Sequence, residues 1–282
     1  MNVSTSPDAQ GSPLGKPAAC HDTYAPDLLF PISRRGKRSE IGIRGDVLPF
    51  IGVDSWNAYE LSWLDARGKP VVALGRFRVP ASSPNLIESK SLKLYLNAFN
   101  QHRVSDAGTI SAILARDLSA AAGAAVEVTI IPLAARPERR FAYPDGFCLD
   151  TLEIDIDTYR PHPDYLRAEG TTTSETLYSH LLKSNCLVTG QPDWGMLAVR
   201  YTGPAIDRAG LLRYIISFRQ HNEFHEQCVE QMFCDILARC KPSALAVWAR
   251  YTRRGGIDIN PFRATPGADD GGWDADSGEI RQ

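Results

Sequence analysis

The chain repeats one order of predicted elements: two strands, two helices and a third strand. Strands with alternating polar and apolar residues and helices with apolar residues three or four apart are told apart by their periods. The first copy comprises strands at 54–65 and 71–79, helices from about residue 91 and from 105 or 106 to 122, and a strand at 125–133. The second comprises strands at 176–183 and 194–201, helices at 207–219 and 223–239, and strands at 243–251 and 257–262.

This order limits the fold class. Paired strands followed by grouped helices favour an α+β fold with antiparallel sheets over a parallel, doubly wound sheet. We divide the chain into a flexible leader and lead-in (1–45), a first module (46–135), a connection (136–174), a second module (175–263) and a tail (264–282). The connection is rich in Pro, Arg, Asp and Thr and contains a short strand-like run at 148–157, whereas the Gly/Asp-rich tail is expected to be mobile.

Local signals fix several helix ends. Leu92, Tyr95, Leu96 and Phe99 share one side of the first helix. Ser105 or Asp106 is suited to cap the second helix, Gly123 is suited to end it, and Asp207 is a suitable cap in the second copy. These signals predict two helices in each module, packed together on one face of its sheet.

Composition describes an ordinary cytoplasmic protein. The net charge of −2 gives no reason to expect broad attachment to nucleic acid or to anionic lipid. No apolar run is long enough for a membrane helix, and residues 1–16 lack the apolar core of a signal peptide. Six cysteines without a CxxC pair indicate free thiols in a reducing compartment rather than a zinc ribbon. The dinucleotide-binding and P-loop glycine motifs are absent from the sequence.

One polar loop interrupts the strand pair of the second module. It carries Cys186 and then a turn, 190–192, which returns Asp193 towards the cysteine. A thiol and a carboxyl on one loop are the groups needed for covalent attack on an electrophilic carbon followed by proton delivery. The alternative is a small buried cysteine and a turn-capping aspartate.

Four motifs in the expected order resemble those of the NADPH-dependent 7-cyano-7-deazaguanine reductases, the QueF nitrile reductases, in their long form with two fused modules. The resemblance covers about residues 48–262 and excludes both tails. Its motifs are ESKSLKLY at 88–95, the loop 183–195, FHEQC at 224–228, and 253–262.

The resemblance implies tandem tunnelling-fold modules, the fold shared with GTP cyclohydrolase and related pterin enzymes. It implies reduction of the nitrile of 7-cyano-7-deazaguanine to the primary amine 7-aminomethyl-7-deazaguanine, in the queuosine tRNA-modification pathway. The cofactor is NADPH, two per nitrile, with no metal. The implied partners are the small deazapurine and a second copy of the chain in a homodimer, with no direct contact to nucleic acid.

Site roles follow from the same resemblance. Cys186 is the nucleophile that forms a thioimide, and Asp193 donates the proton to the nitrile nitrogen. Lys183 or His225 is expected to lower the pKa of the thiol, and burial beside Trp194 to raise that of Asp193. The expected substrate-binding residues are Ile87, Glu88, Ser89, His225 and Glu226, divided between the two modules.

The two glutamates suit a guanine-like edge because one carboxylate can accept two adjacent N–H groups. As plain alternatives, Glu88 caps a helix and Glu226 occupies a solvated helix position. The expected cofactor-binding residues are Ser89, Lys90, Arg254 and Gly255, where a helix start and a glycine turn could meet phosphates. The alternative for 253–256 is a solvated hairpin turn.

Three other functions stay open at this point. Cys186 with His180 or His225 could serve a cysteine hydrolase or transferase. A cyclohydrolase-like enzyme would need a zinc site, for which the sequence offers no convincing third ligand. A purine- or pterin-binding module without catalysis would not need Cys186, and the fold alone does not decide between these functions.

Overall fold

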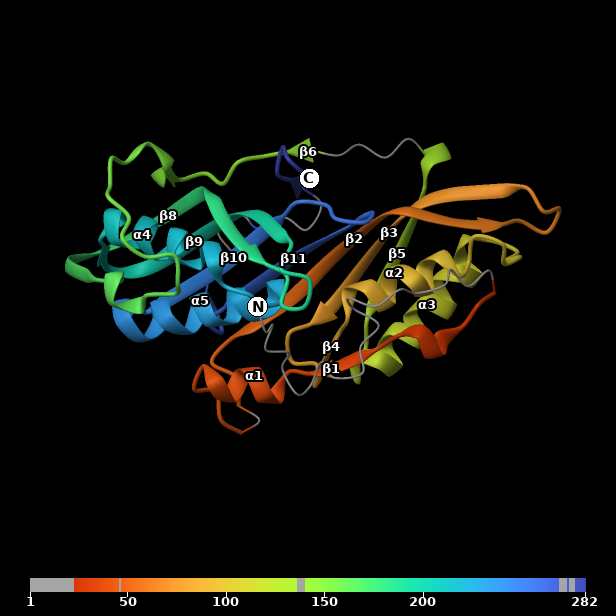
Figure 1. Cartoon of the computed structure of the whole chain (residues 1–282), viewed down its shortest axis with the longest axis horizontal. Coiled ribbons are helices and arrows are strands. Elements are labelled where there is room, and N and C mark those ends of the chain that lie inside the picture. Colours follow the sequence, from red (N-terminus) through yellow and green to blue (C-terminus); the bar gives the residue numbers. More distant parts are fainter. Residues whose placement is uncertain (1–22, 46, 136–139, 269–272, 274–276) are drawn as a thin grey trace. The chain divides into compact units, whose positions relative to one another are not determined.

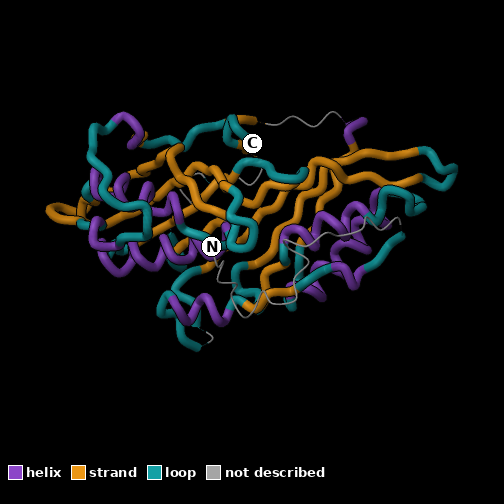
Figure 2. Tube along the Cα trace, in the orientation of Figure 1, coloured by secondary structure: helices purple, strands orange, loops and turns teal. Residues whose placement is uncertain are grey.

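The structure is a computed structural model that describes residues 23–45, 47–135, 140–268, 273 and 277–282. The chain forms two compact units, each assembled from three segments. Unit 1 consists of Met1–Lys37, Val53–Glu138 and Arg253–Asp258, and unit 2 of Arg38–Gly52, Arg139–Thr252 and Ile259–Gln282. Both units are α+β, and Figures 1 and 2 show helices grouped beside strands in each.

Unit 1 contains an antiparallel sheet whose strand order is β5-β3-β2. Its helices α2 and α3 lie together along these strands (Figure 1). A two-stranded antiparallel pair, β1 with β4, precedes α2. The bounds are β1 Pro31–Ser33, α1 Arg35–Glu40, β2 Ile51–Leu64, β3 Pro70–Pro80, β4 Asn85–Ile87, α2 Ser89–Asn97, α3 Ala107–Ala122 and β5 Glu127–Pro132, with 3-10 turns at Pro26–Leu28 and Leu133–Ala135.

The ends of α3 follow from its sequence. The Asp106 carboxylate caps the helix by accepting the Thr109 N–H at 2.8 Å. Gly123 ends the helix at φ +71°, and a Cβ there would lie 2.7 Å from Cγ of Pro84, so only glycine suits the position.

Unit 2 contains five strands in the order β11-β10-β9-β8-β7. Neighbouring strands in this order are antiparallel, except that β7 and β8 are parallel. A separate parallel pair joins β12 to β6. The bounds are β6 Arg140–Phe141, β7 Phe147–Cys148, β8 Ala168–Asn185, β9 Pro192–Ile206, α4 Arg208–Ser217, α5 His225–Cys240, β10 Ala244–Tyr251, β11 Ile257–Ala264 and β12 Ser277–Gly278, with 3-10 turns at Leu149–Thr151, Pro163–Tyr165 and Phe218–Gln220.

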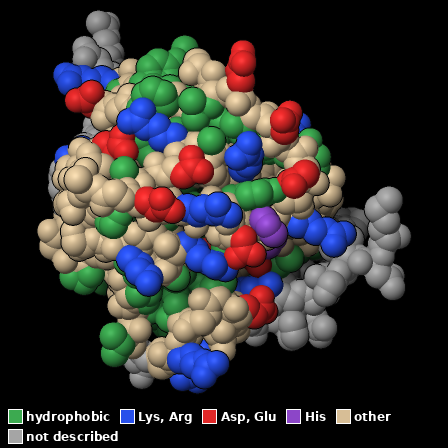
Figure 3. All heavy atoms as spheres, turned by 90° about the vertical axis from the view of Figure 1, so that its left-hand side faces the viewer, with side chains coloured by type: hydrophobic (Ala, Val, Ile, Leu, Met, Phe, Trp, Pro, Cys, Tyr) green, Lys and Arg blue, Asp and Glu red, His purple; other side chains and the backbone are tan. Residues whose placement is uncertain are grey.

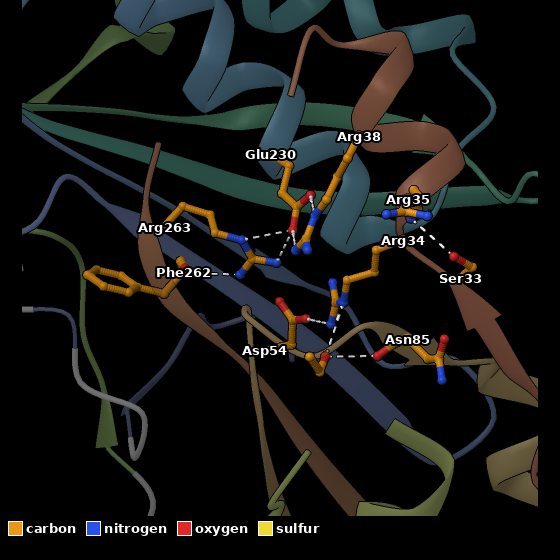
Figure 4. A network of polar contacts seen from close by, with 10 residues as sticks. Ser33, Arg34, Arg35, Arg38, Asp54, Asn85, Glu230, Phe262 and Arg263 are labelled. Carbon is orange, nitrogen blue, oxygen red and sulfur yellow. Dashed lines mark hydrogen bonds and ion pairs between the residues drawn. The ribbon is translucent and has the colours of Figure 1, made fainter. Parts of the chain in front are cut away.

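A buried ion network links three segments of unit 2 (Figure 4). The Glu230 carboxylate accepts from the guanidinium groups of Arg38 at 2.7 and 2.9 Å and of Arg263 at 2.9 Å. Both guanidinium groups also lie over the Phe50 ring, at 5.7 and 5.4 Å from its centroid. Because both cations bind the same buried carboxylate, these contacts connect α5 to β11 and to the end of α1. In unit 1, Arg34 pairs with Asp54.

The predicted strands and helices are confirmed to within a few residues, apart from the start of the second strand pair, where β8 begins earlier than expected. Antiparallel sheets with two neighbouring helices in each unit agree with the predicted fold class. The strand expected at 148–157 is wrong, because only Phe147–Cys148 pairs and a 3-10 turn follows. The strand β1 and the helix α1 were not predicted at all.

The tail prediction is wrong for the residues that can be described. Glu279 is 1% exposed and Gln282 is 5% exposed. The Gln282 side chain donates to the Tyr251 carbonyl at 2.8 Å and to Asn260 at 2.6 Å. Residues 1–16 of the predicted flexible leader lie outside the described residues.

Among the described residues, no helix is long and apolar enough to cross a membrane. Acidic and basic side chains are mixed over the face in Figure 3, so the described part of that face has no extended patch of one charge. This mixture matches the small net charge of the chain.

Candidate active site

The loop that carries Cys186 is closed by its own backbone. The Cys186 N–H donates to the Gln191 carbonyl at 2.8 Å, and the Gly190 N–H donates to the Cys186 carbonyl at 3.0 Å. Gly190 has φ +65°, a conformation that glycine adopts without strain. The loop therefore fixes the backbone of Cys186 between the end of β8 and the start of β9.

Cys186 directly follows β8, and Asp193 is the second residue of β9. Asp193 pairs with Ser184, and residues two apart on a strand point to one face. Cys186 and Asp193 are each 5% exposed.

His225, the first residue of α5, faces the Asp193 carboxyl. Its Nε2 atom is 3.3 Å from Oδ2 of Asp193, and both side chains are largely buried. The His225 ring stacks on Tyr251 of β10, with centroids 3.8 Å apart and planes inclined by 4°. This stacking holds the imidazole in one orientation. The role of Tyr251 has no local sequence signal, because the contact joins a helix start to the end of a later strand.

Hydrogen bonds attach the start of α5 to the end of β8. The Asn185 N–H donates to the His221 carbonyl at 2.8 Å, and the Glu223 N–H donates back to the Asn185 carbonyl at 3.0 Å. The segment before α5 is therefore tied to the residue preceding Cys186. The predicted pair of Cys186 and His225 belongs to one continuous framework within unit 2.

A second thiol near this site is not suited to act as the nucleophile. Cys228 of α5 is fully buried, and burial raises the pKa of its thiol far above the usual value, with Glu223 raising it further. A thiol held in its protonated form is a poor nucleophile. Cys228 is therefore no alternative to Cys186, the nucleophile expected from its loop.

Lys183 and Trp194 both contact Arg219. The Lys183 ammonium donates to Asn185 and, at 2.8 Å, to the Arg219 carbonyl, and burial and the charge of Arg219 lower its pKa. Trp194 is 40% exposed, with the Arg219 guanidinium 5.4 Å from its ring. The prediction that Trp194 buries Asp193 is wrong, because neighbouring residues of a strand point to opposite faces.

Glu226 lies in the first turn of α5 and is 2% exposed. The solvated-position alternative for this residue is therefore wrong. A carboxylate at a helix N-terminus is favoured by the helix dipole, which offsets part of the cost of its burial. His180, the other histidine considered as a base, lies 3.2 Å from Glu279 through its Nδ1 atom.

In unit 1, Glu88 caps α2. This is the role that the sequence analysis gave as the alternative to substrate binding. Its carboxylate accepts the N–H groups of Lys90 and Ser91, each at 2.7 Å, and the side chain is fully buried. Burial raises the pKa of the Glu88 carboxyl, against the effect of these two N–H groups. The Lys90 N–H is therefore bound to Glu88, which corrects the expectation that it is available to a phosphate. Ser89 begins α2, and Ile87 ends β4 with 3% exposure.

The segment 253–256 forms a tight turn, closed by the Arg254 N–H donating to the Ile257 carbonyl at 3.0 Å. Gly255 has φ +62°, and a Cβ built on it would lie 3.3 Å from Nζ of Lys93. Lys93 was not predicted as a site residue. Its only local signal is its position one helical turn after Lys90, which places both on neighbouring parts of α2.

The predicted residues thus fall into two groups. Cys186, Asp193 and His225 are assembled in unit 2, with Glu226 beside His225. The residues from Ile87 to Lys90 stand at the start of α2 in unit 1, which also contains Arg254 and Gly255.

Two protein-family models match the chain. Residues 20–130 match the family described as "Nitrile reductase, 7-cyano-7-deazaguanine-reductase N-term", and residues 192–269 match "QueF-like protein". One match for each half agrees with a two-module form. A solved structure, an archaeosine synthase QueF-Like in the apo form, aligns with 36% of this chain and 99% of that chain at a TM-score of 0.31 and 14% identity, too low to support an argument.

Three curated relatives, each described as an NADPH-dependent 7-cyano-7-deazaguanine reductase, match nearly the whole length. The protein of Azoarcus sp. (strain BH72) is 69% identical over 94% of this chain and 95% of its own. That of Aromatoleum aromaticum is 65% identical over 94% and 95%, and that of Dechloromonas aromatica 63% identical over 91% and 91%. The chain therefore belongs to the family of NADPH-dependent 7-cyano-7-deazaguanine reductases.

Proposed function

We propose that this protein reduces the nitrile of 7-cyano-7-deazaguanine to the primary amine, with Cys186 as the nucleophile. The Cys186 sulfur adds to the nitrile carbon and the nitrogen takes up a proton, which gives a thioimide. Each of two NADPH molecules supplies one hydride. After the first hydride and a proton, the carbon–sulfur bond breaks to release an imine and the thiol, and the second hydride and proton complete the amine.

The observation that carries this proposal is the arrangement around the Cys186 loop. Asp193 pairs with Ser184, two residues before Cys186, and Nε2 of His225 lies 3.3 Å from the Asp193 carboxyl. The carboxyl is the proton donor to the nitrile nitrogen, and the imidazole returns a proton to it. Tyr251 keeps the imidazole aimed at Asp193 through the stacked contact.

Glu226 and Glu88 are proposed to hold the deazaguanine base. Both are buried at the start of a helix, Glu88 as the N-cap of α2 and Glu226 in the first turn of α5. A buried carboxylate that accepts two adjacent N–H groups distinguishes a guanine-like edge from an adenine-like one. Ile87, Ser89 and His225 are assigned to the same substrate. The Glu88 oxygens also cap α2, so their role towards the substrate uses their remaining acceptor capacity.

NADPH is proposed to bind unit 1 through a basic cluster of Lys90, Lys93 and Arg254 beside Gly255. The fit rests on Lys93, whose side chain packs against Gly255, with Nζ 3.3 Å from where a Cβ at that position would stand. Ser89 stands at the start of the same helix. Basic side chains near a backbone without a Cβ suit a phosphate, and the 2′-phosphate of NADPH is the group that NADH lacks.

Replacing Lys93 with alanine is expected to raise the KM for NADPH about tenfold, because one charge-assisted contact to phosphate is lost. The KM for the nitrile should stay unchanged, and the preference for NADPH over NADH should narrow. Lys69→Ala, in the β2–β3 turn, is the matched control. Equal KM values for NADPH in Lys93→Ala and in the control would remove Lys93 from the cofactor site.

We further propose that the protein works in the cytoplasm as a homodimer. The cysteines that the structure describes form no disulfide with one another, the state expected in a reducing compartment. Light scattering on the purified protein should give twice the mass of the chain. A single-chain mass together with full activity would show that the dimer is not needed.

The test of the function is the decrease in NADPH absorbance when the purified protein meets 7-cyano-7-deazaguanine. Two NADPH consumed for each nitrile, with the amine as product, is the expected result. Release of ammonia and a carboxylic acid without NADPH consumption would instead indicate a thiol hydrolase. No reaction and no adduct from well-folded protein would leave only a binding function on the same scaffold.

A further inference from the structure

A cluster of three different metal-ligating side chains lies apart from the residues assigned to the reaction. Cys148, Asp150 and His180 each offer one ligand atom, and these atoms all lie within 4.8 Å of one another. Cys148 ends β7, Asp150 follows in the 3-10 turn, and His180 is on β8. All three side chains are half-buried, so a solvated ion can reach them.

The backbone around this cluster holds its members in place. Strand β7 pairs with β8 so that Cys148 is opposite Tyr178, two residues before His180. The Asp150 carboxylate accepts the His180 N–H at 3.1 Å and the Ser179 hydroxyl at 2.6 Å. The carboxylate keeps further acceptor capacity, because an ionised carboxylate offers about four lone-pair sites.

The imidazole of His180 also lies next to the carboxylate of Glu279. Its Nδ1 atom lies 3.2 Å from Oε1 of Glu279, which is 1% exposed and is held by Nε of Arg281 at 2.9 Å. Metal-bound histidines almost always direct the ring nitrogen that is not coordinated to such a partner. This contact turns Nδ1 towards Glu279 and leaves Nε2 as the ring nitrogen that binds the ion.

We propose that Cys148, Asp150 and His180 form a binding site for Zn²⁺ or a similar borderline transition-metal ion, and that this site is structural. Sulfur, nitrogen and oxygen donors together suit zinc, whereas magnesium and calcium prefer oxygen alone. Zinc bonds of about 2.0–2.3 Å place ligand atoms about 3.3–3.8 Å apart, so the cluster contracts by about 1 Å on binding. A water molecule supplies the fourth ligand.

Binding joins parts of unit 2 that are far apart in sequence. The Cys148 thiol gives up its proton to solvent as the sulfur–metal bond forms, and the charge of the metal ion does not change. The ion then connects β7 to β8 and, through Glu279, to the segment after β12. Because β8 leads into the Cys186 loop, the metal steadies the strand that carries the nucleophile without taking part in the reaction.

Cobalt(II) is the probe, because a thiolate ligand gives it a sulfur-to-metal charge-transfer band. The full chain, carrying Cys186→Ala to remove the reactive thiol, is stripped of metal and titrated. One equivalent of Co²⁺ is expected to bind with this band, and Zn²⁺ should displace it. Cys148→Ser should abolish the band, and Glu279→Gln should weaken binding about 10- to 100-fold. Cys234→Ser, another half-buried thiol, is the matched control and should change nothing.

A band that survives in Cys148→Ser, or the absence of saturable binding in the parent chain, would overturn the proposal. Should Cys148→Ser fail to fold, His180→Gln answers the same question, since unchanged Co²⁺ affinity in that variant also overturns it. The readout does not depend on nitrile reduction. Failure of the metal site and failure of the proposed function are therefore distinguishable.

Discussion

Replacement of Cys186 with alanine should lower kcat/KM for nitrile reduction by about 10⁴-fold or more, because the covalent intermediate no longer forms. Hydride transfer needs a carbon–nitrogen double bond polarised by the thioimide, and the unactivated nitrile does not provide it. Folding should be unaffected, since cysteine to alanine removes one atom from a loop that is closed by backbone hydrogen bonds. The measurement is NADPH consumption under saturating nitrile.

A second readout separates this effect from a general loss of activity. Without NADPH, the wild-type protein should gain the mass of one 7-cyano-7-deazaguanine in intact-protein mass spectrometry, and the variant should gain none. Cys234→Ala, a half-buried thiol in the same unit, is the control and should keep both adduct and activity. An adduct that persists in Cys186→Ala would assign the chemistry to another thiol.

Asp193→Asn should lower kcat by about 10²- to 10⁴-fold, the usual contribution of a positioned proton donor. The amide has nearly the same shape as the carboxyl, so a decrease in kcat measures the missing proton donor and not a change in packing. The pH–rate profile of kcat should lose the limb that reports the donor, because the rate of an acid-assisted step falls as the acid loses its proton. The Cys186 adduct should form more slowly than in the wild type.

Asp207→Asn provides the matched control, because Asp207 is an exposed helix cap that accepts the Ala209 N–H at 3.1 Å. It should change stability slightly and kcat not at all. If Asp193→Asn kept the wild-type rate and pH profile, His225, whose Nε2 atom lies 3.3 Å from this carboxyl, would be the next candidate for the proton donor.

Much of the site could be predicted because its parts are local in sequence. Strand alternation and the turn at Gly190 place Cys186 and Asp193 on one loop, and both signals lie within a few residues. Helix caps at Asp106 and Asp207 are likewise local. The family resemblance then assigned roles that residue types alone left open, such as the base-binding role proposed for Glu226.

The rest depends on packing between distant segments. The stacking of Tyr251 on His225 and the position of Lys93 beside Gly255 arise only when the strands and helices assemble. By composition, the polar, Gly/Asp-rich tail resembles a disordered segment. Glu279 and Gln282 are nevertheless buried, because Glu279 lies next to His180 and Gln282 donates a hydrogen bond to the Tyr251 carbonyl. The composition of a segment gives its average polarity, but it does not show which partners the folded protein offers to each polar side chain.

The segmented make-up of the two units has a consequence for chimeric proteins. A crossover placed between residues 138 and 139 separates Arg253–Asp258 from the rest of unit 1 and Arg38–Gly52 from the rest of unit 2. Halves exchanged between two relatives at that point would each carry a foreign piece inside a native unit. A chimera that respects the fold has to transfer those two short segments together with the units that they complete.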